Sequence, residues 1–273
     1  MVEAGLMIIG AGSAVAMGVA EVDLLCTAAD SAPPFPLRVP SNGVTGTERR
    51  AVLRTAGERL AARGLADERG PLGVAEAFTY LLQDAPMSLD LVLSIGADTV
   101  GVVLLARQDL AVLVTQDLSA PDSVSMAELP FDDAVDELLY LIPEHDAALA
   151  APFSLPKTAL NQVYRTLLQR RGQPLGVGEW EELLVRHGIT DRLARRLVTH
   201  LQPVLGNGQM GLATRGGYAN QWRRAGAELR WLDTDRGRFQ LVDTDDGGWL
   251  SVNPLHGHDL ASAVRGLARS LRR

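Results

Sequence analysis

The residues that could do chemistry are histidines, aspartates and one cysteine, and their spacing does not build a metal site. His256 and His258 form a His-x-His pair beside Asp259. A transition metal needs further imidazole, thiolate or carboxylate ligands, and the other three histidines are dispersed along the chain. We interpret Asp259 as the N-cap of a final helix, and we predict no metal ligand.

Aspartates also gather near the C-terminus, around two glycine-containing turns. They are Asp233, Asp235, Asp243, Asp245 and Asp246. The third loop carboxylate and the closing glutamate of an EF-hand are missing, and glycine stands where a hairpin turn requires it. These aspartates therefore indicate hairpins, and not a calcium site or a pair of acid–base carboxylates.

Motifs of nucleotide binding and nucleophilic catalysis are incomplete or missing. Gly10-Ala11-Gly12 resembles the start of a dinucleotide fingerprint, but Val15 stands where the third glycine is needed. The sequence contains neither a Gly-x-Ser-x-Gly elbow nor a Walker loop. We therefore expect no catalytic residue, no cofactor and no enzymatic activity.

Composition favours a cytoplasmic protein. The 273 residues are 47% hydrophobic and 22% charged, and Cys26 is the only cysteine, so an internal disulfide cannot form. The uncharged run Ala4–Ala20 follows Glu3 instead of a cationic segment, which is unlike a signal peptide. It is also shorter than the roughly 20 apolar residues of a membrane span, so we expect no membrane insertion.

Hydrophobic periodicity predicts that the first half, residues 19–149, forms helices, then a sheet and then a closing helix. Helices are predicted after an N-cap at Thr47 up to Gly64, and at 74–82. Apolar alternation then predicts an antiparallel meander with strands at 89–95, 100–105, 110–115 and 124–129. A helix at 132–142 closes this half.

The second half, residues 150–273, repeats that order. Ser154 is expected to cap a helix with Pro156 in its first turn, and helices follow at 179–186 and 191–201. Strands are predicted at 210–214, 228–233, 239–242 and 249–252, before a final helix. The fold class is therefore α+β, with two pseudo-twofold related halves in one compact structural unit. Residues 1–18 form an apolar extension or a first strand.

The basic region 178–224 leaves a second function open. Residues 180–201 could form a helix-turn-helix with Gly188 in the turn and Arg192, Arg195 and Arg196 on the second helix, followed by a wing strand. Residues 1–149 hold 22 acidic and 8 basic side chains, whereas residues 150–273 hold 11 and 18. A winged-helix-like nucleic-acid-binding protein is the alternative hypothesis.

Several segments resemble the EspG family, the ESX (type VII) secretion-associated chaperones of actinobacteria. The resemblance covers about residues 19–271. It rests on the following ranges: Val22–Leu25, Phe35–Ser41, Glu48–Leu65, Trp231–Phe239 and Gly248–Pro254. The succession of tryptophan, Asp-Thr, Arg-Gly-Arg, an aromatic residue, tryptophan and proline in the last two ranges is the most specific part.

The resemblance implies a non-enzymatic cytosolic chaperone with pseudo-twofold related halves. Such a protein binds the PPE-like subunit of a PE–PPE heterodimer, keeps the pair soluble and directs it to the ESX secretion machinery, with no nucleic acid as a partner. The expected contact surface includes 207–215 and a connection at 218–224. Its candidate partner-binding residues are Asn207, Gln209, Arg215 and Trp222. Inward packing of Trp222 stays open, as do the identity of the client and the oligomeric state.

Overall fold

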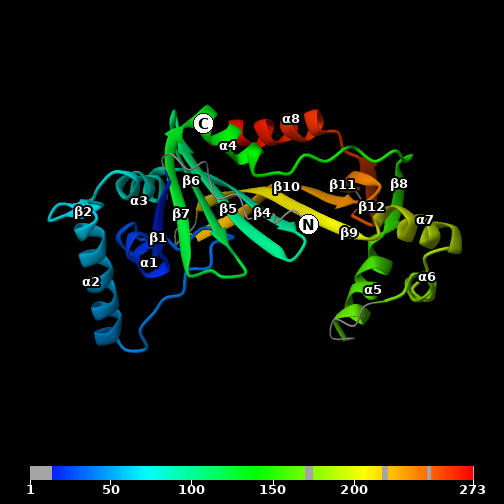
Figure 1. Cartoon of the computed structure of the whole chain (residues 1–273), viewed down its shortest axis with the longest axis horizontal. Helices are drawn as coiled ribbons and strands as arrows, with labels where there is room; N and C mark the ends of the chain where they lie inside the picture. The colour runs from blue at the N-terminus through cyan, green and yellow to red at the C-terminus, as the bar shows by residue number, and fades with distance from the viewer. Residues whose placement is uncertain (1–13, 170–174, 217–220, 245–246, 273) are drawn as a thin grey trace, which may run out of the picture. The chain divides into compact units, whose positions relative to one another are not determined.

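The computed structural model describes residues 14–169, 175–216, 221–244 and 247–272, which form two compact units. The first unit comprises Met1–Pro143, Gln209–Glu228 and Ala261–Arg273, and the second comprises Glu144–Gly208 and Leu229–Leu260. Helices and antiparallel strands are both abundant, which confirms the α+β class (Figure 1). Because the two units are discontinuous in sequence, the division into residues 19–149 and 150–273 stays a prediction.

The sheet of the first unit contains the predicted antiparallel meander. Its hydrogen-bonded order is β1 (Val15–Gly18), β7 (Ser123–Pro130), β6 (Leu110–Asp117), β5 (Asp98–Arg107), β4 (Met87–Ile95) and then β9 (Val204–Gly216). The registers are antiparallel from β1 to β4. Of the predicted N-terminal extension, Val15–Gly18 form β1, and residues 1–13 lie outside the described residues.

Helices cover this sheet because its central strands are apolar on both faces. Val112 and Val114 of β6 join a core cluster with Val22 of α1 (Val19–Ala28) and Phe78 of α3 (Val74–Asp84). Leu113 points the other way and is also fully buried. Helix α4 (Phe131–Tyr140) follows β7 directly and contacts β6 and β7. Residues 102–106 and 111–116 are accordingly buried without interruption.

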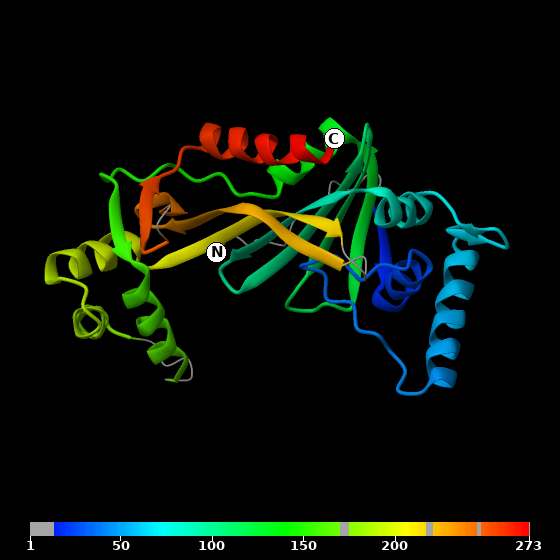
Figure 2. The ribbon, with the colours of Figure 1, turned by 180° about the vertical axis from the view of Figure 1, so that it is seen from behind.

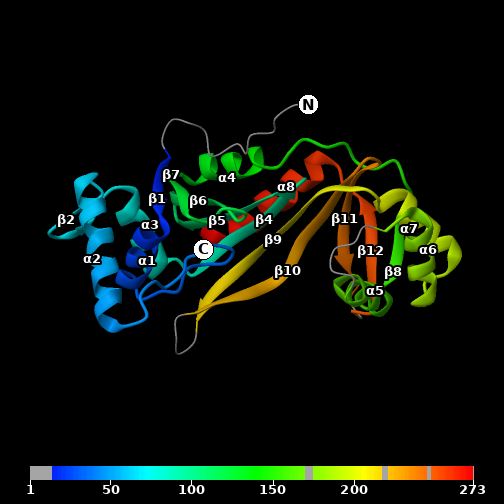
Figure 3. The same cartoon turned by 60° about the horizontal axis from the view of Figure 1, so that its bottom comes forward.

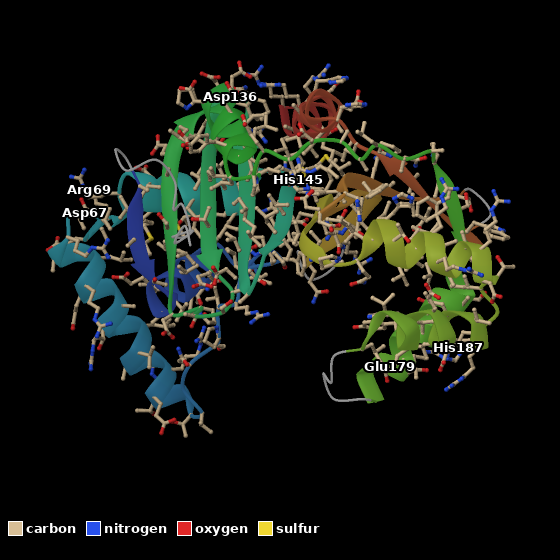
Figure 4. All side chains as sticks on the ribbon, turned by 45° about the vertical axis from the view of Figure 1, so that its right-hand side comes forward. Asp67, Arg69, Asp136, His145, Glu179 and His187 are labelled. Carbon is tan, nitrogen blue, oxygen red and sulfur yellow. The ribbon has the colours of Figure 1, made fainter. Side chains whose placement is uncertain are left out.

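Helix α2 (Gly46–Ala62) begins two residues earlier than expected, so the predicted N-cap at Thr47 is wrong. Thr45 is the N-cap, and its hydroxyl accepts a hydrogen bond from the Glu48 amide at 3.2 Å. The Glu48 carboxylate accepts one from the Thr45 amide at 3.0 Å, which completes a capping box. A hairpin of β2 (Ala66–Asp67) and β3 (Gly70–Pro71) follows, with Asp67 and Arg69 at its tip (Figure 4).

The second unit packs three helices against short strands (Figure 2). Its strand order is β10 (Gln221–Thr234), β11 (Gly237–Asp243), β12 (Trp249–Pro254) and β8 (Phe153–Pro156). Phe239 of β11 and Val252 of β12 share a core with α5 (Lys157–Gln169), α6 (Val177–Arg186) and α7 (Asp191–Leu201). The predicted bounds of α6 and α7 agree with these to within two residues.

Two predicted helix starts in the C-terminal half are wrong. Ser154 lies within β8 and pairs with Ser251 of β12, because Phe153 and Leu155 alternate into the core and favour an extended backbone. Helix α8 (Gly257–Ala268) starts before Asp259, whose amide already donates to the His256 carbonyl at 3.1 Å. A 3-10 turn, η1 (Arg269–Arg272), follows α8.

Strands β9 and β10 are longer than predicted, and each contributes residues to both units. Residues 221–224, predicted to be part of a connection, are strand in β10, and Tyr218 lies outside the described residues. Within the part of the chain that the structure describes, no helix combines the length and apolar character needed to cross a membrane.

Candidate functional site

Three of the four predicted contact residues lie in one segment of the first unit, Gln209–Glu228, which we call the hairpin segment. Its described residues are the adjacent ends of β9 and β10, which run side by side in Figure 3. Gln209, Arg215 and Trp222 are each half-buried there. Asn207 is also half-buried but belongs to the second unit.

Arg215 attaches the end of β9 to the C-terminus of α3. Its guanidinium donates hydrogen bonds to the carbonyls of Leu82 and Gln83, and its backbone amide donates to the Pro86 carbonyl at 3.0 Å. The last carbonyls of a helix have no partner within the helix, and a cation there is favoured by the helix dipole. Burial lowers the pKa of Arg215, whereas the carboxylate of Asp84 raises it.

Trp222 packs partly against the core of the first unit. Its ring centre lies 5.8 Å from the guanidinium carbon of Arg215, so the structure brings these two predicted residues together. Its indole Nε1 is buried and has no hydrogen-bond partner among the described residues. One side of the residue therefore serves the fold, while the remainder is accessible to solvent.

Gln209 belongs to a polar network that the sequence analysis did not anticipate. Its side-chain amide donates to Glu228 at 2.8 Å, and Glu228 pairs with the Nε of Arg224 at 2.9 Å. A terminal nitrogen of Arg224 lies 2.5 Å from the Oδ2 of Asp90 on β4. The network thus connects the hairpin segment to the meander of the first unit.

Asp90 is the buried end of this network. Its exposed fraction is 1%, and its Oδ1 has no hydrogen-bond partner among the described residues. Burial raises the pKa of Asp90 to about 6, although hydrogen bonding and attraction to Arg224 act in the opposite direction. The carboxyl group therefore changes charge in a range that lies close to neutral pH.

A sequence pattern could have identified Asp90, but not its partners. It is the one acidic residue within the apolar run 89–93, and such a residue costs free energy unless it is paired. Arg224 and Glu228 are four residues apart, a spacing that is read first as a helical pair. Only the strand conformation of β10 and its position near β4 bring them to Asp90.

The aspartates at the β10–β11 turn serve the fold, as the hairpin interpretation predicts. Asp233 and Arg238 form a buried ion pair with a distance of 2.6 Å between Oδ1 and Nε. The hydroxyl of Thr234 accepts a hydrogen bond from the Arg236 amide at 3.1 Å and donates to the Gly237 carbonyl at 3.0 Å. These contacts close the turn.

Two histidines, His145 and His187, form side-chain hydrogen bonds within the fold. The Nε2 of His145 lies 2.8 Å from the Thr234 carbonyl, and that of His187 lies 3.2 Å from the Thr166 hydroxyl; both histidines are labelled in Figure 4. His256 and His258 stack with 5.4 Å between ring centres. Across the described residues, no group of three or more potential ligands could hold a metal ion.

The helix-turn-helix hypothesis is not supported. Helices α6 and α7 do flank Gly188, but Arg196 is turned toward its own unit, where it donates to the Ala151 carbonyl and lies 4.7 Å from the Phe153 ring centre. A surface hollow beside α7 is lined by Glu181 and Glu182 as well as arginine. Carboxylates at this position would repel a phosphate backbone.

Comparisons with known proteins agree with the resemblance read from the sequence. The solved structure of the Mycobacterium tuberculosis type VII secretion system chaperone EspG5 in complex with the PE25–PPE41 dimer is similar in fold, with a TM-score of 0.61 at 16% identity. The match covers 95% of this chain and 97% of that chain. A comparison with curated protein sequences found no match. The family model of the EspG family matches residues 18–266, and the chain therefore belongs to the EspG family.

Proposed function

We propose that this protein is a cytoplasmic chaperone of a type VII (ESX) secretion system that binds the PPE-like subunit of a PE–PPE export substrate without catalysing a reaction. The observation that carries the proposal is the EspG family match over residues 18–266. The similarity in fold to EspG5, whose solved structure contains a PE–PPE dimer, supports it along almost the whole chain.

Such a function requires a surface and not a catalytic centre. An export substrate that exposes apolar side chains is prone to self-association, and a partner that covers them keeps it soluble by mass action alone. A contact area of roughly 1,200 to 2,000 Å² with a small apolar centre and a polar rim would give specific, reversible binding.

Within the first unit, the proposed contact residues are Gln209, Arg215 and Trp222, and Asn207 is a further candidate in the second unit. Each is half-buried, so each combines a fixed position with some accessible area. Arg215 and Trp222 are held by contacts to α3 and to the core of the first unit. A side chain that is held before binding loses less conformational entropy on binding, which favours its use in a contact.

Co-expression tests the function directly. The tagged protein would be produced together with individual PE–PPE pairs from its source genome, purified at about 0.15 M salt, and washed at about 1 M salt. We expect one pair to co-purify in equal amounts and to remain bound at high salt, because the centre of the interface is apolar. Failure of every pair to co-purify would contradict the proposal.

Substitutions would locate the surface. Asn207→Ala should weaken binding without changing the melting temperature. Gln209→Ala loses the hydrogen bond to Glu228, and Trp222→Leu loses indole contacts with the core, so both should weaken binding and also lower stability. Arg54→Ala in α2 is the control in the same unit, since Arg54 is exposed and lies outside the expected contact ranges 207–215 and 218–224. Equal affinities for all these variants would place the contact surface elsewhere.

A further inference from the structure

We propose that Asp90 is a positioning residue whose negative charge holds residues 221–228 of β10 in place through Arg224, so that client binding weakens when Asp90 is protonated. The part of this proposal that concerns the client rests on the proposed function. The part that concerns the hairpin segment can be tested on the free protein.

Arg224 links β10 of the hairpin segment to β4. It pairs with Asp90 at 2.5 Å and with Glu228 at 2.9 Å, and its guanidinium carbon lies 5.6 Å from the Phe35 ring centre. Gly211 makes room for this side chain, because a Cβ atom at that position would collide with the guanidinium group. One arginine therefore links β10 to β4 and to the segment that contains Phe35.

Asp90 contributes the only buried charge to this arrangement. The side chain of Asp90 is 1% exposed, whereas those of Arg224 and Glu228 are 32% and 24% exposed. Surface ion pairs contribute little, while a charge-assisted hydrogen bond in a buried setting is about twice as strong as a neutral one. The contact between Asp90 and Arg224 should therefore dominate the side-chain link between β10 and β4.

The groups around Asp90 determine what its protonation does. From β10 it faces Arg224 and Glu228, the two charges that act on its pKa. On β5 it pairs with Val103, which is neutral. Gln209 of β9, which is also neutral, donates its side-chain amide to Glu228. Once Asp90 is neutral, the carboxylate that still pairs with Arg224 is that of the more exposed Glu228. Glu228 lies on the same strand as Arg224 and cannot attach β10 to β4.

The raised pKa of Asp90 determines the pH range of the effect, and the influence of Arg224 on that pKa determines its direction. Its folded value of about 6 exceeds the ordinary value, so acidification from neutral pH protonates the carboxyl group in the folded protein. The global stability contributed by this group increases as the pH falls toward the ordinary value, because the folded state binds the proton more tightly. The contact with Arg224 responds in the opposite direction: Arg224 lowers the pKa of Asp90, so protonation of the buried carboxyl group weakens this contact while the fold as a whole is not weakened.

Hydrogen exchange of the free protein at neutral pH tests the attachment. Asp90→Asn keeps the shape of the side chain and removes the charge, and we expect about tenfold faster amide exchange in residues 221–228, the loss expected for a charge-assisted hydrogen bond. Asp136→Asn is the matched control, because it removes an exposed partner of Arg265 at 2.9 Å in the same unit. Equal exchange in the Asp90→Asn and Asp136→Asn proteins would overturn the proposal.

The affinity for the PE–PPE dimer recovered by co-expression tests the consequence. At about pH 5, roughly a tenth of the wild-type protein keeps Asp90 charged, so the dissociation constant should rise about tenfold between pH 7 and pH 5. The Asp90→Asn protein should bind weakly at both values, and the Asp136→Asn protein should follow the wild type. A wild-type affinity that does not change with pH would overturn the effect on binding. If no dimer binds at all, the proposed function fails, and the exchange measurement still decides whether Asp90 holds the hairpin segment.

Discussion

The ion pair between Arg238 and Asp233 is the most buried one in the part of the second unit that the structure describes. The two side chains are 2% and 9% exposed, and Arg238 also lies over the Trp231 ring. Arg238→Met should lower the free energy of unfolding by about 3 to 5 kcal/mol, because it leaves the Asp233 charge buried without its partner. Urea unfolding followed by circular dichroism measures this change.

Arg236 provides the control for that substitution, since it belongs to the same turn. Its side chain is exposed and lies 3.8 Å from Asp235. Arg236→Ala should change the free energy of unfolding by less than about 0.5 kcal/mol. Similar losses in the two variants would mean that burial does not determine the cost.

Cys26 illustrates the opposite situation, in which burial removes reactivity. Desolvation, with a smaller contribution from the Asp23 charge, raises the pKa of its thiol to about 12. The thiolate is the reactive form, so iodoacetamide at about pH 8 should leave Cys26 unmodified in the folded protein and alkylate it in urea. Rapid alkylation of the folded protein, detected by mass spectrometry, would contradict the buried position.

The N-terminus of α2 shows why the position of a cap is hard to read from sequence. Thr45 and Thr47 both precede the apolar positions of this helix, but only Thr45 forms the capping box with Glu48. Thr45→Ala should lower the free energy of unfolding by about 1 kcal/mol, whereas Thr47→Ala should cost much less. If the two substitutions had the opposite order of effects in urea unfolding, the expected cap at Thr47 would be correct.

Strand β9 carries a steric requirement at Gly208. A Cβ atom there would overlap the indole of Trp231, which is fully buried on β10. Gly208→Ala should therefore destabilise the protein by about 1 to 3 kcal/mol through overpacking. Gly178→Ala in α6 is the control, because that position is open and alanine favours a helix; its melting temperature should stay the same or rise.

The elements that sequence predicted well are those whose pattern is local. The strands β4 to β7 alternate or run apolar without interruption, and short turns separate them, so their order followed directly. The first halves of β9 and β10 have mixed polarity and show no clear apolar alternation, so the predicted strands were too short. Ser154 and Pro156 resemble a helix start, and only pairing with β12 makes the segment a strand.

The candidate site was predicted in part for the same reason. Gln209, Arg215 and Trp222 were placed in one region by the family resemblance, and the structure gathers them in the hairpin segment. Asp90 and Arg224 were missed because they are 134 positions apart and meet only through strand pairing. Local spacing carries no information about such a contact.

At the scale of the whole molecule, the two compact units redistribute the charge of the chain. By sequence order the first 149 residues are strongly acidic and the remainder is basic. The basic stretches Gln209–Glu228 and Ala261–Arg273, however, belong to the first unit. That unit therefore holds 15 basic and 21 acidic residues, and the second holds 11 and 12. Neither unit carries net positive charge.

Because neither unit is positively charged, we predict that the protein does not bind nucleic acid. A binding measurement therefore tests the alternative hypothesis of a nucleic-acid-binding protein. Binding to duplex DNA requires several phosphate contacts and is strongest at low salt. Fluorescence anisotropy with a labelled duplex at about 0.05 M salt should show no saturable binding. Arg192 and Arg195 are exposed and have no role in the proposed function. Replacing both with alanine should therefore give the same result, an absence of saturable DNA binding. Saturable binding that disappears at about 0.2 M salt and in the arginine variants would instead restore the helix-turn-helix hypothesis. In that case the arginines of α7 would outweigh the acidic side chains beside them.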